Sequence, residues 1–448
     1  MMLGQLLFEL FSCKDAMNGS KPDGLRLPND REDTDHSADN CSVVSNISDA
    51  TSIYDDIGVQ TAIAEQQDGD DTTTVAFDDF EEKVKDCIDG CTQKSAGGRQ
   101  NCLKGLVTAF SKRYVFDFLL DRYVTITDSL ERCLKKGKGE EQVLAAKCAM
   151  SLVIQLGPGA EGNEVYRSIK PIMQTVMLDR SASSKARAAC AEGMAVCCFI
   201  AGGDLEEVVT MLSTLETIFS ASYLKGDKSP PTVTPEMTQL HFAALNGWSL
   251  LLSISPPSAV DTLLYSHLPK LPQLLESADV DLRIAAGEAI ALMYELAREQ
   301  DEEFEGDDID NLCTILKRLA TDSNKYRAKK DRRQQRSSFR DILKTIEIGE
   351  SPELSIKFGP EVLIIDSWVR KRQYDMMCNC IGAGINVHLQ ENELVRDIFE
   401  LGAPIPVGTA KPIKSSKHER HQYNLACFKA RTKAMSKVRD KRMVQASY

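Results

Sequence analysis

The chain has 448 residues, of which 42% are hydrophobic and 6% aromatic, with two Trp. This composition supports a substantial core and favours helix packing by small residues over a β-sandwich. The net charge of -12 is unevenly distributed: residues 1–80 carry 4 Lys/Arg against 17 Asp/Glu, residues 325–344 carry 9 against 2, and residues 411–448 carry 11 against 2.

Cysteine usage and the length of the apolar runs argue against a disulfide-stabilised scaffold and against a membrane-spanning protein. The 14 Cys have no regular spacing, and Cys197 and Cys198 are adjacent, so free and mostly buried thiols are expected instead of a disulfide scaffold. No run approaches the roughly 18–20 apolar residues of a membrane span. The apolar start, Met1–Phe11, lacks the basic region and cleavage site of a signal peptide. We expect a cytoplasmic protein, with the nucleus as a second compartment.

Residues 1–77 are predicted to be an acidic disordered leader, because Asp, Ser, Thr and Asn dominate and apolar residues show no sustained period. From Phe80 onward, apolar patterns of period 3.6 recur and predict helices. Five of the predicted helices carry the same pattern of apolar or small residues on one face, spaced four and then three residues apart. The five sets are Leu103, Val107 and Phe110; Ala145, Ala149 and Leu152; Ala186, Cys190 and Gly193; Leu240, Ala244 and Gly247; and Leu282, Ala286 and Ala289.

The first positions of these sets are 42, 41, 54 and 42 residues apart, close to the roughly 40–47 of HEAT or armadillo units. The long interval contains an inserted loop, Lys225 to Pro235. Small residues on the faces let neighbouring helices approach closely. Residues 78–349 are therefore predicted to form an all-α, armadillo/HEAT-like helical solenoid, with an irregular helical bundle as the alternative.

Residues 325–344 are predicted to form an amphipathic basic helix within this domain. At 100° per residue, eight cations fall within an arc of about 160°: Lys325, Lys329, Lys330, Arg332, Arg333, Arg336, Arg340 and Lys344. Phe339, Ile342 and Ile346 group on another side and can pack on the solenoid. The cationic face is a candidate RNA-binding surface; a solvated helix or a nuclear-import signal is the alternative.

A small mixed module is expected over residues 350–402. Leu354 to Phe358 and Glu361 to Ile365 are predicted to be short strands, and Trp368 to Cys380 and Asn392 to Leu401 to be helices. Residues 403–417, rich in Pro and Gly, are predicted to be a linker.

Residues 418–448 are predicted to form a basic C-terminal helix with charge on all sides. Its candidate RNA-binding residues are Arg420, Lys429, Arg431, Lys433, Lys437, Arg439, Lys441 and Arg442. Such a helix has neither a continuous apolar face nor a heptad seam, so neither a membrane nor a coiled-coil partner fits it. It is suited to enclosure by phosphates, and about 25 residues would reach roughly 38 Å. A disordered basic tail or a localisation signal is the alternative.

Catalytic and cofactor motifs are missing from the sequence. No phosphate-binding loop, dinucleotide fingerprint, metalloprotease or nucleophile-elbow motif stands in a convincing context. Cys378, Cys380 and His388 form an incomplete zinc set. We expect no metal, no cofactor, no small-molecule substrate and no enzymatic activity.

Seven segments carry a resemblance to a known family. They are LERCLKKGKGEEQ (130–142), IQLGPG (154–159), CCFIA (197–201), LRIAAGEAIALMYELAR (282–298), LATDSNKYRAKKDRRQQRSSFRDIL (319–343), FGPEVLIIDSW (358–368) and FKARTKAMSKVRDKR (428–442). Over roughly residues 78–442 the chain resembles the interferon-related developmental regulator family.

The resemblance implies an armadillo-like fold, a C-terminal family module and association with translationally inactive ribosomes. The solenoid would dock in the intersubunit space, the 325–344 face would contact rRNA, and the basic tail would occupy the mRNA channel and repress translation. The alternative function is a nuclear transcriptional co-regulator, in which the concave face of the solenoid is a scaffold for partner proteins in differentiation. An importin-like carrier is a third and weaker interpretation.

Overall fold

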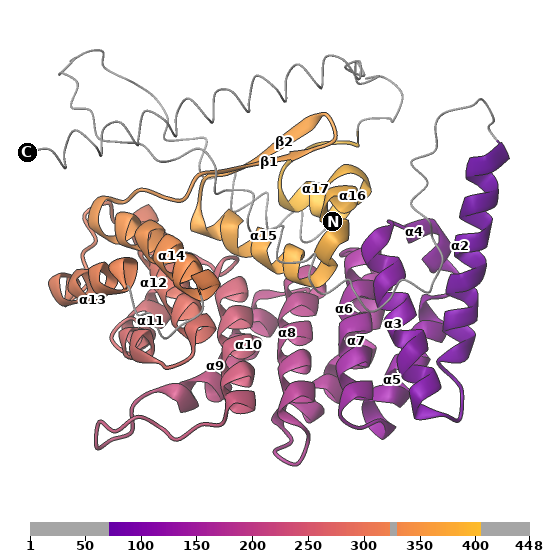
Figure 1. The fold of residues 1–448 in the computed structure, drawn as a ribbon, viewed down its shortest axis with the longest axis horizontal. Coiled ribbons are helices and arrows are strands. Elements are labelled where there is room, and N and C mark those ends of the chain that lie inside the picture. Colours follow the sequence, from indigo (N-terminus) through magenta and orange to yellow (C-terminus); the bar gives the residue numbers. More distant parts are fainter. Residues whose placement is uncertain (1–70, 323–328, 405–448) are drawn as a thin grey trace, which may run out of the picture. The chain divides into compact units, whose positions relative to one another are not determined.

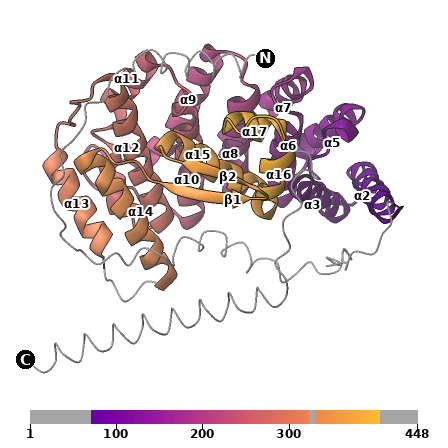
Figure 2. The same ribbon diagram turned by 90° about the horizontal axis from the view of Figure 1, so that it is seen from above.

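The structure, a computed structural model, describes residues 71–322 and 329–404. Its core is a first layer of helices in which each contacts the next along the chain. These are α3 (Ala96–Lys112), α6 (Glu140–Leu156), α8 (Ser184–Ala201), α10 (Pro235–Leu252), α12 (Val280–Gln300) and α14 (Lys329–Ile348). Figures 1 and 2 show the resulting stack.

A second layer connects these helices and packs on them. It consists of α5 (Tyr123–Lys136), α7 (Ala160–Leu178), α9 (Leu205–Phe219), α11 (Pro257–His267) and α13 (Ile309–Thr321), while α2 (Asp71–Gly90) packs on α3. Short elements lie between them: α4 (Phe116–Leu120), η3 (Ser220–Ser222) and η4 (Leu271–Glu276). The predicted all-α solenoid is confirmed by this stacking.

The repeated small-residue faces predicted from the sequence lie in α3, α6, α8, α10 and α12, and their side chains are buried except for the half-buried Val107. Gly247 shows why small residues are needed, because a Cβ there would lie 2.6 Å from the Cβ of Ala195. The inserted loop is also confirmed, since residues 223–234 join η3 to α10 without a helix or strand.

One predicted boundary is shifted at the start. Helix α2 begins at Asp71, within the last part of the predicted leader. An acidic residue at the first position of a helix interacts favourably with the helix dipole. Residues 1–70, and with them most of the predicted leader, lie outside the described residues.

The C-terminal module begins with the predicted hairpin. Strands β1 (Leu354–Phe358) and β2 (Glu361–Ile365) are antiparallel, with Leu354 opposite Ile365 and Phe358 opposite Glu361. The predicted helix from Trp368 is α15 (Trp368–Ile381).

The predicted helix Asn392–Leu401 is wrong in its bounds. It is α17 (Glu393–Ile398), preceded by η5 (Gly382–Gly384) and α16 (Ile385–Glu391). Asn392 separates α16 from α17 because its side chain caps α17, accepting a hydrogen bond from Val395 N at 3.3 Å.

Candidate nucleic-acid interface

Helix α14 is fixed by its apolar side. Phe339, Ile342 and Ile346 are completely buried, as their shared position on the helical wheel predicts. Phe339 and Ile342 pack against Gly287 of α12, where an added Cβ would lie 2.8 Å from both Phe339 Cε1 and Ile342 Cδ1. The close approach of α12 and α14 therefore requires glycine at this position.

Two arginines of α12 hold α14 at both ends. Arg283 Nη2 donates to Gln335 Oε1 at 2.7 Å, and Gln335 Nε2 donates to Leu319 O of α13 at 3.3 Å. At the other end, Arg298 donates to the carbonyls of Thr345 and Ile346. The bond to Ile346 O satisfies a carbonyl that a helix C-terminus leaves open. Helix α14 continues to Ile348, beyond the predicted end at 344.

Because the apolar side is buried, the cations of α14 lie on its other faces. Lys330, Arg333, Arg340 and Lys344 are exposed, and Arg332 and Arg336 are half-buried. Lys329 is in the helix, but its side chain is outside the described residues, as is all of Lys325. Six of the eight predicted positions thus have a described side chain, and four of these face solvent.

The acidic residues near this face only partly offset its charge. Helix α14 contains seven Lys/Arg and three Asp/Glu. Lys344 Nζ lies 3.9 Å from Glu350, which is a long contact between exposed groups and contributes little. Asp341 is half-buried, and burial raises the pKa of its carboxyl above the ordinary value, although neighbouring cations act in the opposite direction.

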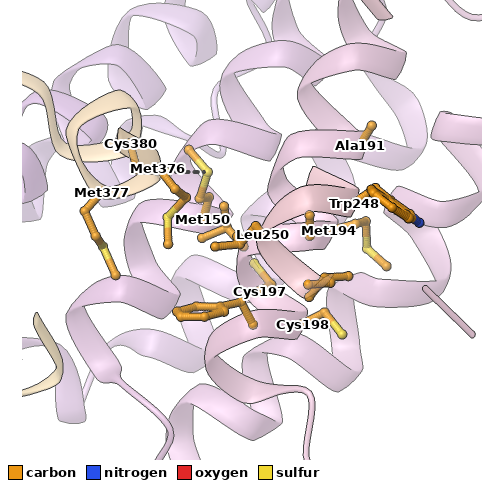
Figure 3. Close-up of a cluster of buried hydrophobic side chains, with 14 of the residues drawn as sticks. Met150, Ala191, Met194, Cys197, Cys198, Trp248, Leu250, Met376, Met377 and Cys380 are labelled. Atoms are coloured by element: carbon orange, nitrogen blue, oxygen red, sulfur yellow. Dashed lines mark hydrogen bonds between the residues drawn. The ribbon is translucent and has the colours of Figure 1, made fainter. Parts of the chain in front are cut away.

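Helix α15 lies across the first layer. It contacts α3, α6, α10 and α12, and Figure 3 shows Met376 and Cys380 beside Met150 of α6. Cys380 Sγ is 3.4 Å from Met150 Sδ. The chain's own C-terminal module therefore covers the first layer where α15 contacts α3, α6, α10 and α12.

A half-buried carboxylate fixes the start of α15. Glu295 of α12 accepts hydrogen bonds from Trp368 N at 2.8 Å, Val369 N at 3.1 Å and Ser351 Oγ at 2.7 Å. Burial raises the pKa of Glu295, and these bonds offset part of the rise. This contact was not predicted from the sequence. The sequence feature that could have indicated it is the pair Glu288 and Glu295, which are seven residues apart and therefore lie on one face of an otherwise apolar helix.

The basic triplet at 370–372 is used inside the protein. Lys371 Nζ lies 2.9 Å from Glu288 and 2.6 Å from Asp375, and Arg372 Nη1 donates to Asn246 Oδ1 at 2.6 Å. Burial alone would lower the pKa of Lys371, but the two carboxylates outweigh it and raise the pKa. These cations hold α15 on the solenoid.

The residues of the incomplete zinc set, Cys378, Cys380 and His388, have structural contacts. His388 is buried, with Nε2 2.9 Å from Phe110 O and Nδ1 3.1 Å from Asn392 Nδ2. Burial raises the pKa of Cys378 to about 11 and that of Cys91 to about 12, so both thiols stay protonated at neutral pH. Within residues 71–322 and 329–404, no group of three or more His, Cys, Asp or Glu is arranged to hold a metal ion.

The predicted RNA-binding residues of the tail, Arg420 to Arg442, lie outside the described residues. Helices long and apolar enough to cross a membrane are not found in the part of the chain that the structure describes.

The described residues define a helical-repeat protein with a cationic helix on its surface and a C-terminal module packed across its first layer. Comparison with known proteins gives the family. The profile described as "Interferon-related developmental regulator (IFRD)" matches residues 40–347, and that described as "Interferon-related protein conserved region" matches residues 392–443. The chain belongs to the interferon-related developmental regulator family.

Its relatives match most of its length. It is 49% identical over 367 residues to interferon-related developmental regulator 1 of Sus scrofa, covering 82% of each chain. It is also 49% identical over 367 residues to interferon-related developmental regulator 2 of Mus musculus, covering 82% of this chain and 83% of that protein. Among solved structures, a designed armadillo repeat protein matches with a TM-score of 0.36 and 13% identity, over 58% of this chain and 99% of that chain.

Proposed function

We propose that this protein is a ribosome-binding translational repressor that associates with inactive ribosomes. The solenoid docks in the intersubunit space, the cationic face of α14 contacts rRNA, and the basic segment 411–448 occupies the mRNA channel. An inserted basic segment and an mRNA exclude each other, so occupancy alone represses translation. The protein acts by binding, without catalysis or a cofactor.

The observation that supports this proposal best is the way α14 is held. Its apolar side is anchored by Phe339 and Ile342 against Gly287, and its ends are bound by Arg283 and Arg298. A cationic face on a rigid element has little conformational entropy to lose on binding, which favours contact with a fixed array of phosphates. The basic 411–448 segment, matched by the second family profile up to residue 443, supports the same partner.

The nuclear co-regulator alternative has less support. It requires an open face of the solenoid as a scaffold for partner proteins, and α15 lies across the first layer at α3, α6, α10 and α12. A partner would have to bind elsewhere or displace α15, whose start is held by three hydrogen bonds to Glu295.

The proposal is tested by two variants of the full chain. One lacks residues 411–448, and the other carries Lys330→Gln, Arg340→Gln and Lys344→Gln, which remove exposed charges from α14. Co-sedimentation with vacant 80S particles on sucrose gradients and inhibition of a translation extract are measured for both.

We expect the deletion to abolish inhibition and the α14 variant to weaken co-sedimentation. The α14 variant should also lower the slope of log affinity against log salt by about 2, because each lost phosphate contact removes about 0.7–0.9. Unchanged sedimentation and inhibition in both variants would refute the proposal, and recovery in nuclear complexes in place of 80S fractions would favour the alternative.

A further inference from the structure

The helices of the first layer run parallel, so their N-terminal ends lie along one edge of the solenoid. Arg99 in the first turn of α3 is bonded to Glu141 in the first turn of α6, at 2.6 and 2.9 Å. Ser184 in the first turn of α8 lies 3.4 Å from Met237 in the first turn of α10. We call the turns that precede these four helices, residues 91–95, 137–139, 179–183 and 223–234, the N-terminal edge (Figure 1).

Each turn of the N-terminal edge carries a cation. They are Lys94, Lys138, Arg180, and Lys225 with Lys228, all exposed. Adjoining positions, counted into the first helical turns, keep the balance positive: residues 132–141, 179–187 and 225–236 together contain nine Lys/Arg against two Asp and three Glu.

At the other ends of the first-layer helices, the connection after α3 (residues 113–122) contains two Arg and two Asp, whereas the later connections have the opposite charge. Residues 157–164, 202–207, 253–261 and 299–310 contain fourteen Asp/Glu and no Lys/Arg. The two edges of the solenoid thus differ in sign along most of its length.

Helix stability explains the acidic edge but not the basic one. Carboxylates such as Glu161 and Glu206 stand in the first turns of α7 and α9, where the helix dipole favours negative charge. Lys138 and Lys185, in contrast, stand at the positive ends of α6 and α8. Their placement opposes the dipole, so a role outside the chain's own stability accounts for it better.

These cations are available to a ligand. Lys136, Lys138, Arg180 and Lys185 are exposed, and none of them forms an ion pair with another residue that the structure describes. Three of the five nearby carboxylates are held by their own partners: Asp179 accepts from Ser181, Asp227 from Ser229, and Glu141 from Arg99. An anion placed here would meet both the ammonium groups and the positive helix ends.

We infer that the N-terminal edge is a second RNA-contacting surface, distinct from α14 and from the tail, and that it binds a phosphate backbone. Helix axes 8–10 Å apart place the turns before α3 and α10 roughly 24–30 Å apart, enough to follow several phosphates. The surface is polar and positive, as nucleic-acid interfaces are, with Leu178 and Leu224 as isolated apolar exposures. The choice of RNA as the polyanion rests on the proposed function.

The test uses the full chain with Lys136→Gln, Lys138→Gln, Arg180→Gln and Lys185→Gln. A matched control removes the same charge elsewhere, by Lys83→Gln, Lys85→Gln, Lys112→Gln and Lys357→Gln, all exposed positions on α2, α3 and β1. Circular dichroism melting verifies that both fold as the wild type does. Binding to a fluorescein-labelled 16-base-pair RNA duplex and to vacant 80S ribosomes is measured between 50 and 300 mM salt.

The edge variant should lower the slope of log affinity against log salt by about 3, since each of four lost phosphate contacts removes about 0.7–0.9, and the control should leave it nearly unchanged. Equal slopes for the edge variant and the control would overturn the inference. So would a loss of binding to labelled polyglutamate with RNA binding intact, which would identify an acidic protein as the partner. If the α14 variant and the tail deletion lose ribosome binding while the edge variant does not, the inference fails and the proposed function stands.

Discussion

Removal of the Glu295 carboxylate should detach the start of α15 from the solenoid. In Glu295→Ala, the backbone N–H groups of Trp368 and Val369 and the hydroxyl of Ser351 lose their acceptor. Hydrogen bonds to a charged group contribute about 1.5–3 kcal/mol each, and the cost of burying the carboxylate offsets part of that sum. We expect a net loss of about 2–4 kcal/mol for the docking of α15, because loss of a helix cap alone costs about 1 kcal/mol.

The assay follows from the position of the two tryptophans. Trp248 is fully buried in α10, whereas Trp368 is the first residue of α15 and donates from Nε1 to Thr345 Oγ1 at 2.7 Å. In a Trp248→Phe background, urea-induced change in Trp368 fluorescence reports the release of α15. Glu295→Gln keeps one acceptor oxygen and should show about half the loss. An unfolding midpoint for Glu295→Ala within error of the parent would mean that apolar contacts hold α15, and would refute a stabilising role for the Glu295 hydrogen bonds.

Two further predictions concern the core. Gly287→Leu should destabilise the packing of α14 by about 1–3 kcal/mol, because the new side chain would overpack against Phe339 and Ile342. The loss is measured as a lower urea midpoint, and Gly226→Ala is a neutral control because nothing lies within 4 Å of a Cβ at that position. Burial lowers the pKa of His241 to about 4, so the unfolded chain binds more protons between that pH and 6.5. The stability from this group is complete above pH 6.5 and falls by about 3 kcal/mol as pH drops to 4; His241→Gln should flatten that part of the urea-unfolding profile, and an unchanged profile would contradict the assignment.

The sequence predicted the solenoid because its determinants are local. Small residues at four-then-three spacing in α6, α8, α10 and α12 are a direct consequence of close helix packing, and all of them are buried. The apolar side of α14 was predictable for the same reason, since Phe339 and Ile342 share one arc of the helix. That these helices run parallel also follows from the repeat, because every unit repeats the same direction.

The packing of α15 was not predictable in the same way. It depends on pairs far apart in the sequence, such as Glu295 with Trp368 and Lys371 with Glu288, whose partners no periodicity reveals. Basic residues at 370–372 and in α14 are alike in composition, yet the triplet is mainly bonded within the chain and much of α14 is exposed. Only the tertiary structure separates cations that hold the fold from cations that face solvent.

That separation also decides which surfaces can bind a polyanion. A cation already bonded to a half-buried carboxylate, as Lys371 is to Glu288, would have to leave that carboxylate unpaired in order to bind phosphate, at a cost of up to several kcal/mol. Lys138 can bind phosphate without such a cost because it has no ion-pair partner among the described residues. The same holds for Lys344, whose contact with Glu350 is long and exposed. Binding should therefore depend on α14 and the N-terminal edge and be insensitive to charge inside the α15 contact. Lys371→Met should accordingly lower the stability of α15 docking, measured by Trp368 fluorescence, and leave the salt dependence of RNA binding unchanged in the folded protein.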